Sequence, residues 1–461
     1  MNRASHGCIC RAALLGALLL GGVALCRGGA SIVRAQPTAD EPGAASDSLA
    51  PEEAAAVPSR AARWRKRRRQ KADAIEPPEP SLIRQALSVV SNVGGAVVPH
   101  RLVLSIPQLE IAGFHPVFGG LEGDAGTTAG VLYEPPFWHG PRRLAEAEVL
   151  ASLRRYYGAG VRVGGRAGPY VGYTYARYQH RPRENFYGLG SGSKTDAEAE
   201  FRLDQGVVGG LVGRLLGPSA LVGGHLSYQV NRYGPAGGSA PQVAGQFGPA
   251  VPGVGTDLDY LMIGGFFELD IRDAPYDRAF GHRFAPTEPR LRGVSLDASR
   301  GFYLATEVTH NLNVGHRQLS FTRFTLDVRE FLPIQEGLLH GFSFRQFASV
   351  THSGGNRVPF YRLQSIGGAR SLRGYASDRF RDRNVLLANA EVRCQVWHWL
   401  DMAVFADAGR VFRDAGAMMG APRLGYGLGF RVKNKGKTLG RVDMAYGSEG
   451  WRLHMDLGSL F

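Results

Sequence analysis

Residues 451–461 read WRLHMDLGSLF, and along this stretch apolar and polar side chains alternate. Such alternation is the two-residue period of a β-strand, and a tilted strand of about eleven residues crosses the apolar layer of a bilayer. One face of this strand is therefore apolar and the other polar. The apolar face consists of Trp451, Leu453, Met455, Leu457 and Phe461.

The segments before it alternate in the same way, as in residues 425–433, and this pattern fits either a soluble β-sandwich or a membrane β-barrel. Composition favours the barrel. No apolar run of about eighteen residues occurs beyond the first thirty, which argues against transmembrane helices. The 63 glycines and the 10% aromatic residues suit strands that face lipid on one side and water on the other. We predict an all-β protein with a transmembrane antiparallel barrel over residues 101–461.

About fourteen strands can be counted from the alternation, and bacterial single-chain barrels use even numbers, so sixteen are predicted. Residues 101–114 are expected to supply part of the remainder, and residues 199–215 are long enough for two strands. The other candidate segments before the last five are 126–133, 145–156, 169–178, 221–233, 258–272, 301–310, 319–331 and 339–351.

The N-terminal residues 1–35 have the composition of an export signal. Arg3 and Arg11 precede the apolar run 12–25, and small residues follow it. A lipoprotein site at Cys26 is the weaker alternative, because a leucine precedes it where a small residue is needed. The mature chain is therefore expected to leave the cytoplasm.

Residues 36–80 are predicted to be a disordered linker, rich in Ala and Pro and then strongly basic, and too polar to build a core. The basic run either contacts an anionic surface, such as lipid headgroups or lipopolysaccharide, or is a solvated tether. Residues 81–100 are predicted to form a short amphipathic helix and a connector; membrane surface, barrel mouth and lumen all remain open as its position. The candidate surface-contact residues are Arg65, Lys66, Arg67, Arg68 and Arg69.

Several motifs over roughly residues 110–461 resemble the BamA/TamA family of outer-membrane barrels, also called bacterial surface antigens. The LRGY sequence at 372–375 alone would be weak evidence for this family, but LRGY followed by NAE and FADAG at this spacing is a specific signal. The matching segments are YGLG at 187–190, ELDIRD with Asp270 and Arg272, VPF at 358–360, LRGY at 372–375, NVLLANAEVR at 384–393, FADAG at 405–409 and the terminal Phe461.

The resemblance implies that the long loop carrying LRGY folds into the lumen, where its arginine, Arg373, pairs with Asp407. The alternation places Glu391 on the water-facing side of its own strand as well, so one guanidinium is expected to reach two carboxylates. Gly374 is expected to allow a tight turn beside the arginine, and Tyr375 completes the motif. The alternative is that these are generic lumen charges that satisfy one another.

The resemblance further implies a signal for barrel assembly at the terminal Phe461, recognised by the machinery that inserts such barrels. It also implies a Gram-negative outer membrane as the location, with lipid and lipopolysaccharide around the barrel. The family's periplasmic POTRA modules are not expected here, because the polar, Arg-rich residues before the barrel lack the pattern of that fold. Nucleic acid is not expected as a partner of an exported chain.

Two functions follow as expectations. The first is assistance in inserting or transporting an unfolded protein client into or across the outer membrane, and the alternative is a passive pore or structural barrel for small solutes. An enzyme is not expected, and neither a catalytic residue, a metal site nor a cofactor is predicted. The tract GLGSGSKT at 188–195 departs from the phosphate-loop pattern, since Ser193 precedes Lys194 where that motif has glycine, and it is predicted to be a surface loop.

Overall fold

A computed structural model describes residues 112–457, except for residues 274–297 and several shorter gaps. The predicted signal (1–35), linker (36–80) and helix with connector (81–100) lie outside the described residues. So do the basic residues 65–69 and the terminal Phe461.

The described chain is almost entirely β-structure. Apart from short 3-10 turns, its helical element is α5 (Val243–Phe247). The strands are β1 (Phe114–Phe118), β2 (Thr128–Tyr133), β3 (Arg143–Ser152), β4 (Tyr157–Ala167), β5 (Tyr170–Phe186), β6 (Ala199–Leu216), β7 (Ala220–Gly234), β8 (Leu258–Asp270), β9 (Gly301–Val314), β10 (Phe321–Pro333), β11 (Leu339–His352), β12 (Gln364–Ile366), β13 (Phe380–Asp382), β14 (Asn384–Trp397), β15 (Leu400–Phe412), β16 (Arg423–Asn434), β17 (Lys437–Gly447) and β18 (Gly450–Leu457).

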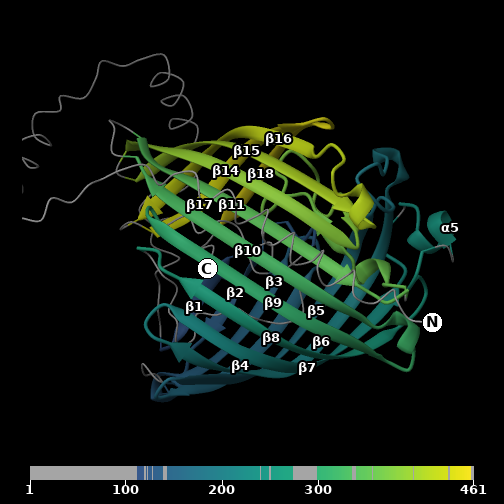
Figure 1. The fold of residues 1–461 in the computed structure, drawn as a ribbon, viewed down its shortest axis with the longest axis horizontal. Coiled ribbons are helices and arrows are strands. Elements are labelled where there is room, and N and C mark those ends of the chain that lie inside the picture. The colour runs from purple at the N-terminus through teal and green to yellow at the C-terminus, as the bar shows by residue number, and fades with distance from the viewer. Residues whose placement is uncertain are drawn as a thin grey trace, which may run out of the picture. The chain divides into compact units, whose positions relative to one another are not determined.

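Sixteen of these strands form one antiparallel sheet, in which each strand pairs with the next in the chain (Figure 1). β12 and β13 form a separate two-stranded sheet, so β11 pairs directly with β14. The prediction of a sixteen-stranded antiparallel barrel is confirmed, and the sandwich alternative is wrong. Among the residues that the structure describes, no pairing joins β1 to β18, and these two edges are called the seam below.

Three strand predictions differ from the structure. The first strand, β1, begins at Phe114, where the predicted segment 101–114 ends, and residues 101–111 lie outside the described residues. Residues 199–215 form the single long strand β6 and not two strands, because their alternation continues without a turn. The strand β4 was missed, because four of its eleven residues are glycine and leave little alternation to detect. Within the described ranges, no helix has the length and apolar character needed to cross a membrane.

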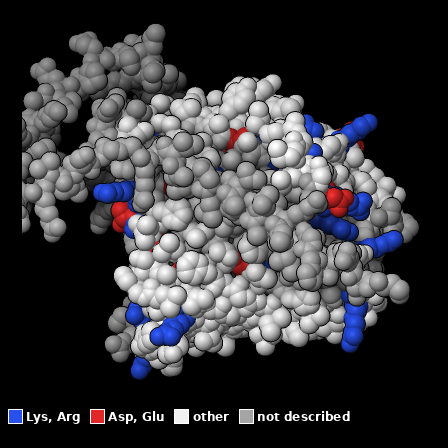
Figure 2. All heavy atoms as spheres, viewed as in Figure 1, with Lys and Arg blue, Asp and Glu red and all other residues white. Residues whose placement is uncertain are grey.

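The two faces of the sheet differ as the alternation predicts. On β15, β16 and β17, Val404, Leu428 and Met444 are exposed on the outer face, whereas Asp407 and Asp443 are buried on the inner face. On the face in view, Lys and Arg gather near the two ends of the barrel and the surface between them is mostly uncharged (Figure 2). An uncharged outer band between charged rims suits a bilayer.

Apart from the β8–β9 connection, most of which is not described, three long connections leave one end of the barrel, because each follows a strand of the same direction. They join β5 to β6, β7 to β8 and β11 to β14. This end is called the loop-rich end. The third connection, residues 353–383, contains β12, β13 and the LRGY motif, and is called the lumen loop.

Candidate functional site

The lumen loop enters the space enclosed by the sheet and touches both walls. Of its LRGY residues, Leu372 and Tyr375 are 0% and 1% exposed. Apolar side chains of the loop pack against the inner face of β11, β14 and β15, as Ile366 and Phe380 do beside Leu387 and Val411. The loop is therefore part of the barrel's core and not a surface feature.

Arg373 contacts both predicted carboxylates. Its Nε donates to Asp407 Oδ2 at 2.8 Å and its Nη2 donates to Asp407 Oδ1 at 2.7 Å, which is bidentate geometry. Its Nη1 donates to Glu391 Oε2 at 2.9 Å. The backbone N–H of Arg373 also donates to Asp407 Oδ2, at 3.0 Å. The structure thus brings together the three charged residues predicted at this site.

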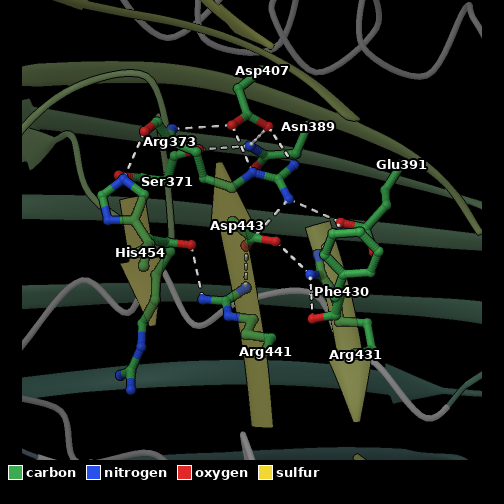
Figure 3. A network of polar contacts seen from close by, with 12 residues as sticks. Ser371, Arg373, Asn389, Glu391, Asp407, Phe430, Arg431, Arg441, Asp443 and His454 are labelled. Atoms are coloured by element: carbon green, nitrogen blue, oxygen red, sulfur yellow. Dashed lines mark hydrogen bonds and ion pairs between the residues drawn. The ribbon is translucent and has the colours of Figure 1, made fainter. Parts of the chain in front are cut away.

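The ion pairs extend beyond these three residues across the inner faces of four strands (Figure 3). Glu391 on β14 also accepts hydrogen bonds from Arg393, at 2.9 Å, and from Arg431 on β16, at 3.0 Å. Arg431 in turn contacts Asp443 on β17. Each carboxylate in this network accepts from at least one guanidinium, as a buried charge requires.

Asn389 ties the loop backbone to the same network. Its Nδ2 donates to the carbonyl of Ser371 and to Asp407 Oδ1, both at 2.7 Å. The guanidinium of Arg373 lies 3.4 Å from the ring centre of Phe405, within cation–π range. Burial opposes the charged form of Arg373, but Asp407 and Glu391 outweigh it and raise the pKa of the guanidinium above its ordinary value.

Gly374 is required for a different reason from the one predicted. Its φ is not positive, so no tight left-handed turn depends on it. Instead, a Cβ at this position would lie 2.8 Å from the carbonyl oxygen of Tyr446 and 2.9 Å from Gly447 Cα. On the inner face of β16, Gly425 also has no side chain, and a Cβ there would lie 2.9 Å from the backbone nitrogen of Gly374. Backbone packs directly on backbone here.

The first part of the lumen loop packs against the opposite wall. Phe360 is fully buried and lies 4.8 and 4.9 Å, between ring centres, from Phe201 and Phe186. Arg362 donates to Gln229 Oε1 at 2.7 Å and to Asn311 Oδ1 at 2.8 Å. These contacts hold the VPF segment to β5–β9, so the loop crosses the lumen from wall to wall.

The β5–β6 connection, which contains the GLGSGSKT tract, lies on the lumen loop. Leu189 forms a parallel bridge with Arg381 of β13, and the N–H of Gly190 donates to the carbonyl of Arg381 at 2.9 Å. Lys194 is exposed. The tract extends the small β12–β13 sheet.

Several network members were not predicted. Arg431 and Asp443 share the inward parity of their strands, so the alternation contained the signal for them. Arg362 and Arg379 lie in the irregular loop, where no alternation of apolar and polar residues identifies them.

The ELDIRD residues Asp270 and Arg272 form an ion pair with each other, with Nη2 of Arg272 2.8 Å from Oδ2 of Asp270. Among the described residues, no group of His, Cys, Asp and Glu is arranged to hold a metal.

Comparison with known proteins agrees with this geometry. Residues 291–448 match the Omp85 superfamily domain. The structure of BamA from Haemophilus ducreyi lacking POTRA domains 1-3 is similar over 76% of this chain and 70% of that chain, with 13% identity and a TM-score of 0.53. No curated protein matches the sequence.

Two CdiB structures are similar at lower scores. CdiB from Acinetobacter baumannii has 12% identity and a TM-score of 0.46, and CdiB from Escherichia coli has 11% and 0.49. They cover 75% and 76% of this chain, which spans only 59% and 63% of theirs.

The matched region contains the lumen loop and the network strands β14 to β17. The fold match to BamA supplies the same barrel architecture. The chain therefore carries an Omp85 superfamily domain over residues 291–448, in a β-barrel with the fold of BamA.

Proposed function

We propose that this barrel aids the insertion or transport of a protein client into or across the outer membrane. Residues 291–448 match the Omp85 superfamily domain, and the BamA/TamA family that the motifs resemble consists of outer-membrane assembly and translocation factors. The observation that carries the proposal is the lumen loop, which is bound to both walls by Arg373 on one side and Phe360 on the other. A barrel filled in this way has to rearrange before anything passes.

The same observation weighs against a passive pore. An open pore would leave its inner wall solvated, whereas inward residues on both walls are buried under the loop. Tyr260 and Met262 of β8 are fully buried, and Asp407 of β15 is 2% exposed. The seam, where no described residue of β1 pairs with β18, offers a second route, since a strand edge can pair with an extended client segment.

The proposed setting is the outer membrane of a Gram-negative bacterium, with lipid and lipopolysaccharide around the uncharged band. The loop-rich end would face outward. An unfolded protein would be the client, and the cell's barrel assembly machinery would insert this chain itself. The basic residues 65–69 remain a proposed contact for anionic headgroups.

Reconstitution of the purified full chain in liposomes tests the proposal with two measurements. The first is ion conductance across the membrane. The second is the folding rate of an unfolded eight-stranded barrel, diluted from urea onto the vesicles and followed by its shift in gel mobility. We expect low, unsteady conductance and faster client folding than on empty vesicles.

The matched control is the Arg357→Ala variant, which changes an exposed arginine of the same loop and should behave as wild type. Steady ohmic conductance without faster client folding would overturn the proposal in favour of the passive pore. Absence of both activities would also overturn it, and would leave a structural barrel.

A further inference from the structure

The lumen loop is hydrogen-bonded to the last hairpin, β17–β18, whose second strand, β18, is one edge of the seam. The Tyr375 hydroxyl lies 3.0 Å from Ser448 Oγ and accepts from the backbone N–H of Ser448 at 3.2 Å. Nε2 of His454, on β18, lies 2.7 Å from the carbonyl oxygen of Arg373. The LRGY residues therefore hold the seam strand as well as the network strands.

Arg379 makes a third contact with the hairpin, at its turn. Its Nη2 lies 2.8 Å from Glu449 Oε1 and its Nε donates to Glu449 Oε2 at 3.0 Å, which is bidentate geometry. The arginine is 1% exposed, between the rings of Tyr187 and Phe380, each with its centre 4.6 Å away. A shielded, bidentate pair of this kind is worth more than a surface ion pair.

The same guanidinium binds the β5–β6 connection. Its Nη1 donates to Ser193 Oγ and its Nη2 to the carbonyl of Ser193, both at 2.8 Å. Neighbouring Ser191 accepts from Arg423 Nη2 at 2.7 Å through its carbonyl, which fastens the connection to the start of β16. Arg379 thus joins three segments of the loop-rich end that are far apart in the sequence.

We infer that release of the lumen loop and release of the β17–β18 hairpin are coupled, and that Arg379 is the latch that holds the two together at the loop-rich end. The hairpin cannot leave the barrel without breaking its bonds to Tyr375, Arg373 and Arg379. The loop cannot leave the lumen without losing the same bonds. Clearing the lumen and freeing the seam strand are therefore one event.

The position of the latch determines what can release it. Glu449 and Ser193 lie in connections of the loop-rich end, so a ligand that displaces the β5–β6 connection would weaken the hold on β18 at the seam. Such a step would regulate the passage of a client, and this consequence rests on the function proposed above. The coupling itself does not require a client.

Hydrogen exchange of the full chain in detergent micelles tests the coupling without a client. The Glu449→Gln variant keeps the shape of the side chain and removes the charge that Arg379 pairs with. We expect about tenfold to a hundredfold faster exchange, by the loss of a shielded charge-assisted pair. The acceleration should be equal in β18, at residues 452–455, and in the lumen loop, at residues 371–375.

Tyr375→Phe is the second variant, because it removes only the hydroxyl, which contacts Ser448 and also donates to the Leu424 carbonyl of β16 at 3.2 Å. It should accelerate the same two segments together. Arg357→Ala is the control and should leave both unchanged. Faster exchange confined to the turn around Glu449, or in only one of the two segments, would overturn the inference. A failed client assay with coupled exchange would refute the proposed function alone.

Discussion

Replacing Arg373 by alanine is expected to open the LRGY half of the lumen loop, and the structure sets the size of the effect. Glu391 would keep Arg393 and Arg431 as partners. Asp407 would keep the Asn389 amide at 2.7 Å and the N–H of residue 373 at 3.0 Å, but would lose its bidentate guanidinium.

Removing one partner of a buried ion pair typically costs about 3 to 5 kcal/mol of stability. Because Asp407 and Glu391 keep other donors, we expect a cost at the lower end, about 3 kcal/mol. About 3 kcal/mol corresponds to roughly a hundredfold larger population of the open loop. Native-state digestion with chymotrypsin measures that population, because cleavage next to Tyr375 and Phe380 requires both buried rings to be released.

We expect cleavage at these two positions to be about a hundredfold faster in Arg373→Ala than in wild type, by the same arithmetic. Arg357→Ala should be cleaved at the wild-type rate. A change of less than about threefold, well under 1.4 kcal/mol, would refute the idea that the Arg373 pairs hold the loop. The residues would then be interchangeable lumen charges.

Two further changes test the packing of the loop against each wall. Gly374→Ala places a Cβ 2.8 Å from the carbonyl oxygen of Tyr446 and should cost about 1 to 3 kcal/mol, seen as a lower urea midpoint in micelles. Gly416→Ala, where nothing lies within 4 Å, is its control; equal midpoints would contradict the close packing. Phe360→Ala empties the centre of an aromatic cluster and should cost about 3 to 5 kcal/mol, also read from the midpoint, and a cost near zero would show that the cluster is not a packed core.

The sheet was predictable from the sequence because the alternation of apolar and polar side chains indicates which side of each strand faces lipid. That pattern indicated about fourteen strands, and the prediction of sixteen also needed the even strand numbers of bacterial barrels and the residues before 114. Inward parity alone placed Glu391 and Asp407 on the inner wall. The alternation failed to identify β4, because its glycines have no side chain that is either polar or apolar.

The details of the lumen loop were not predictable in the same way. Its partners are set by tertiary packing between segments with no common period, as in the contacts of Arg379 with Ser193 and Glu449. Gly374 was identified by its motif, but its reason was not, because close approach to Gly447 depends on two backbones meeting in space. No local rule contains that information.

The bonds between the lumen loop and the last hairpin also determine the order in which the molecule can mature. Arg373 meets its partner on β18 across 81 residues, and Arg379 meets Glu449 across 70. Neither contact can form until the final strands have been synthesised and have paired, and contacts across such distances form late. The loop precedes those strands in the chain but is locked after them. A barrel missing its last hairpin would keep the bonds of Arg373 to β14 and β15 but would lack those of Tyr375, Arg379 and the Arg373 carbonyl to the hairpin, which distinguishes an unfinished molecule from a finished one.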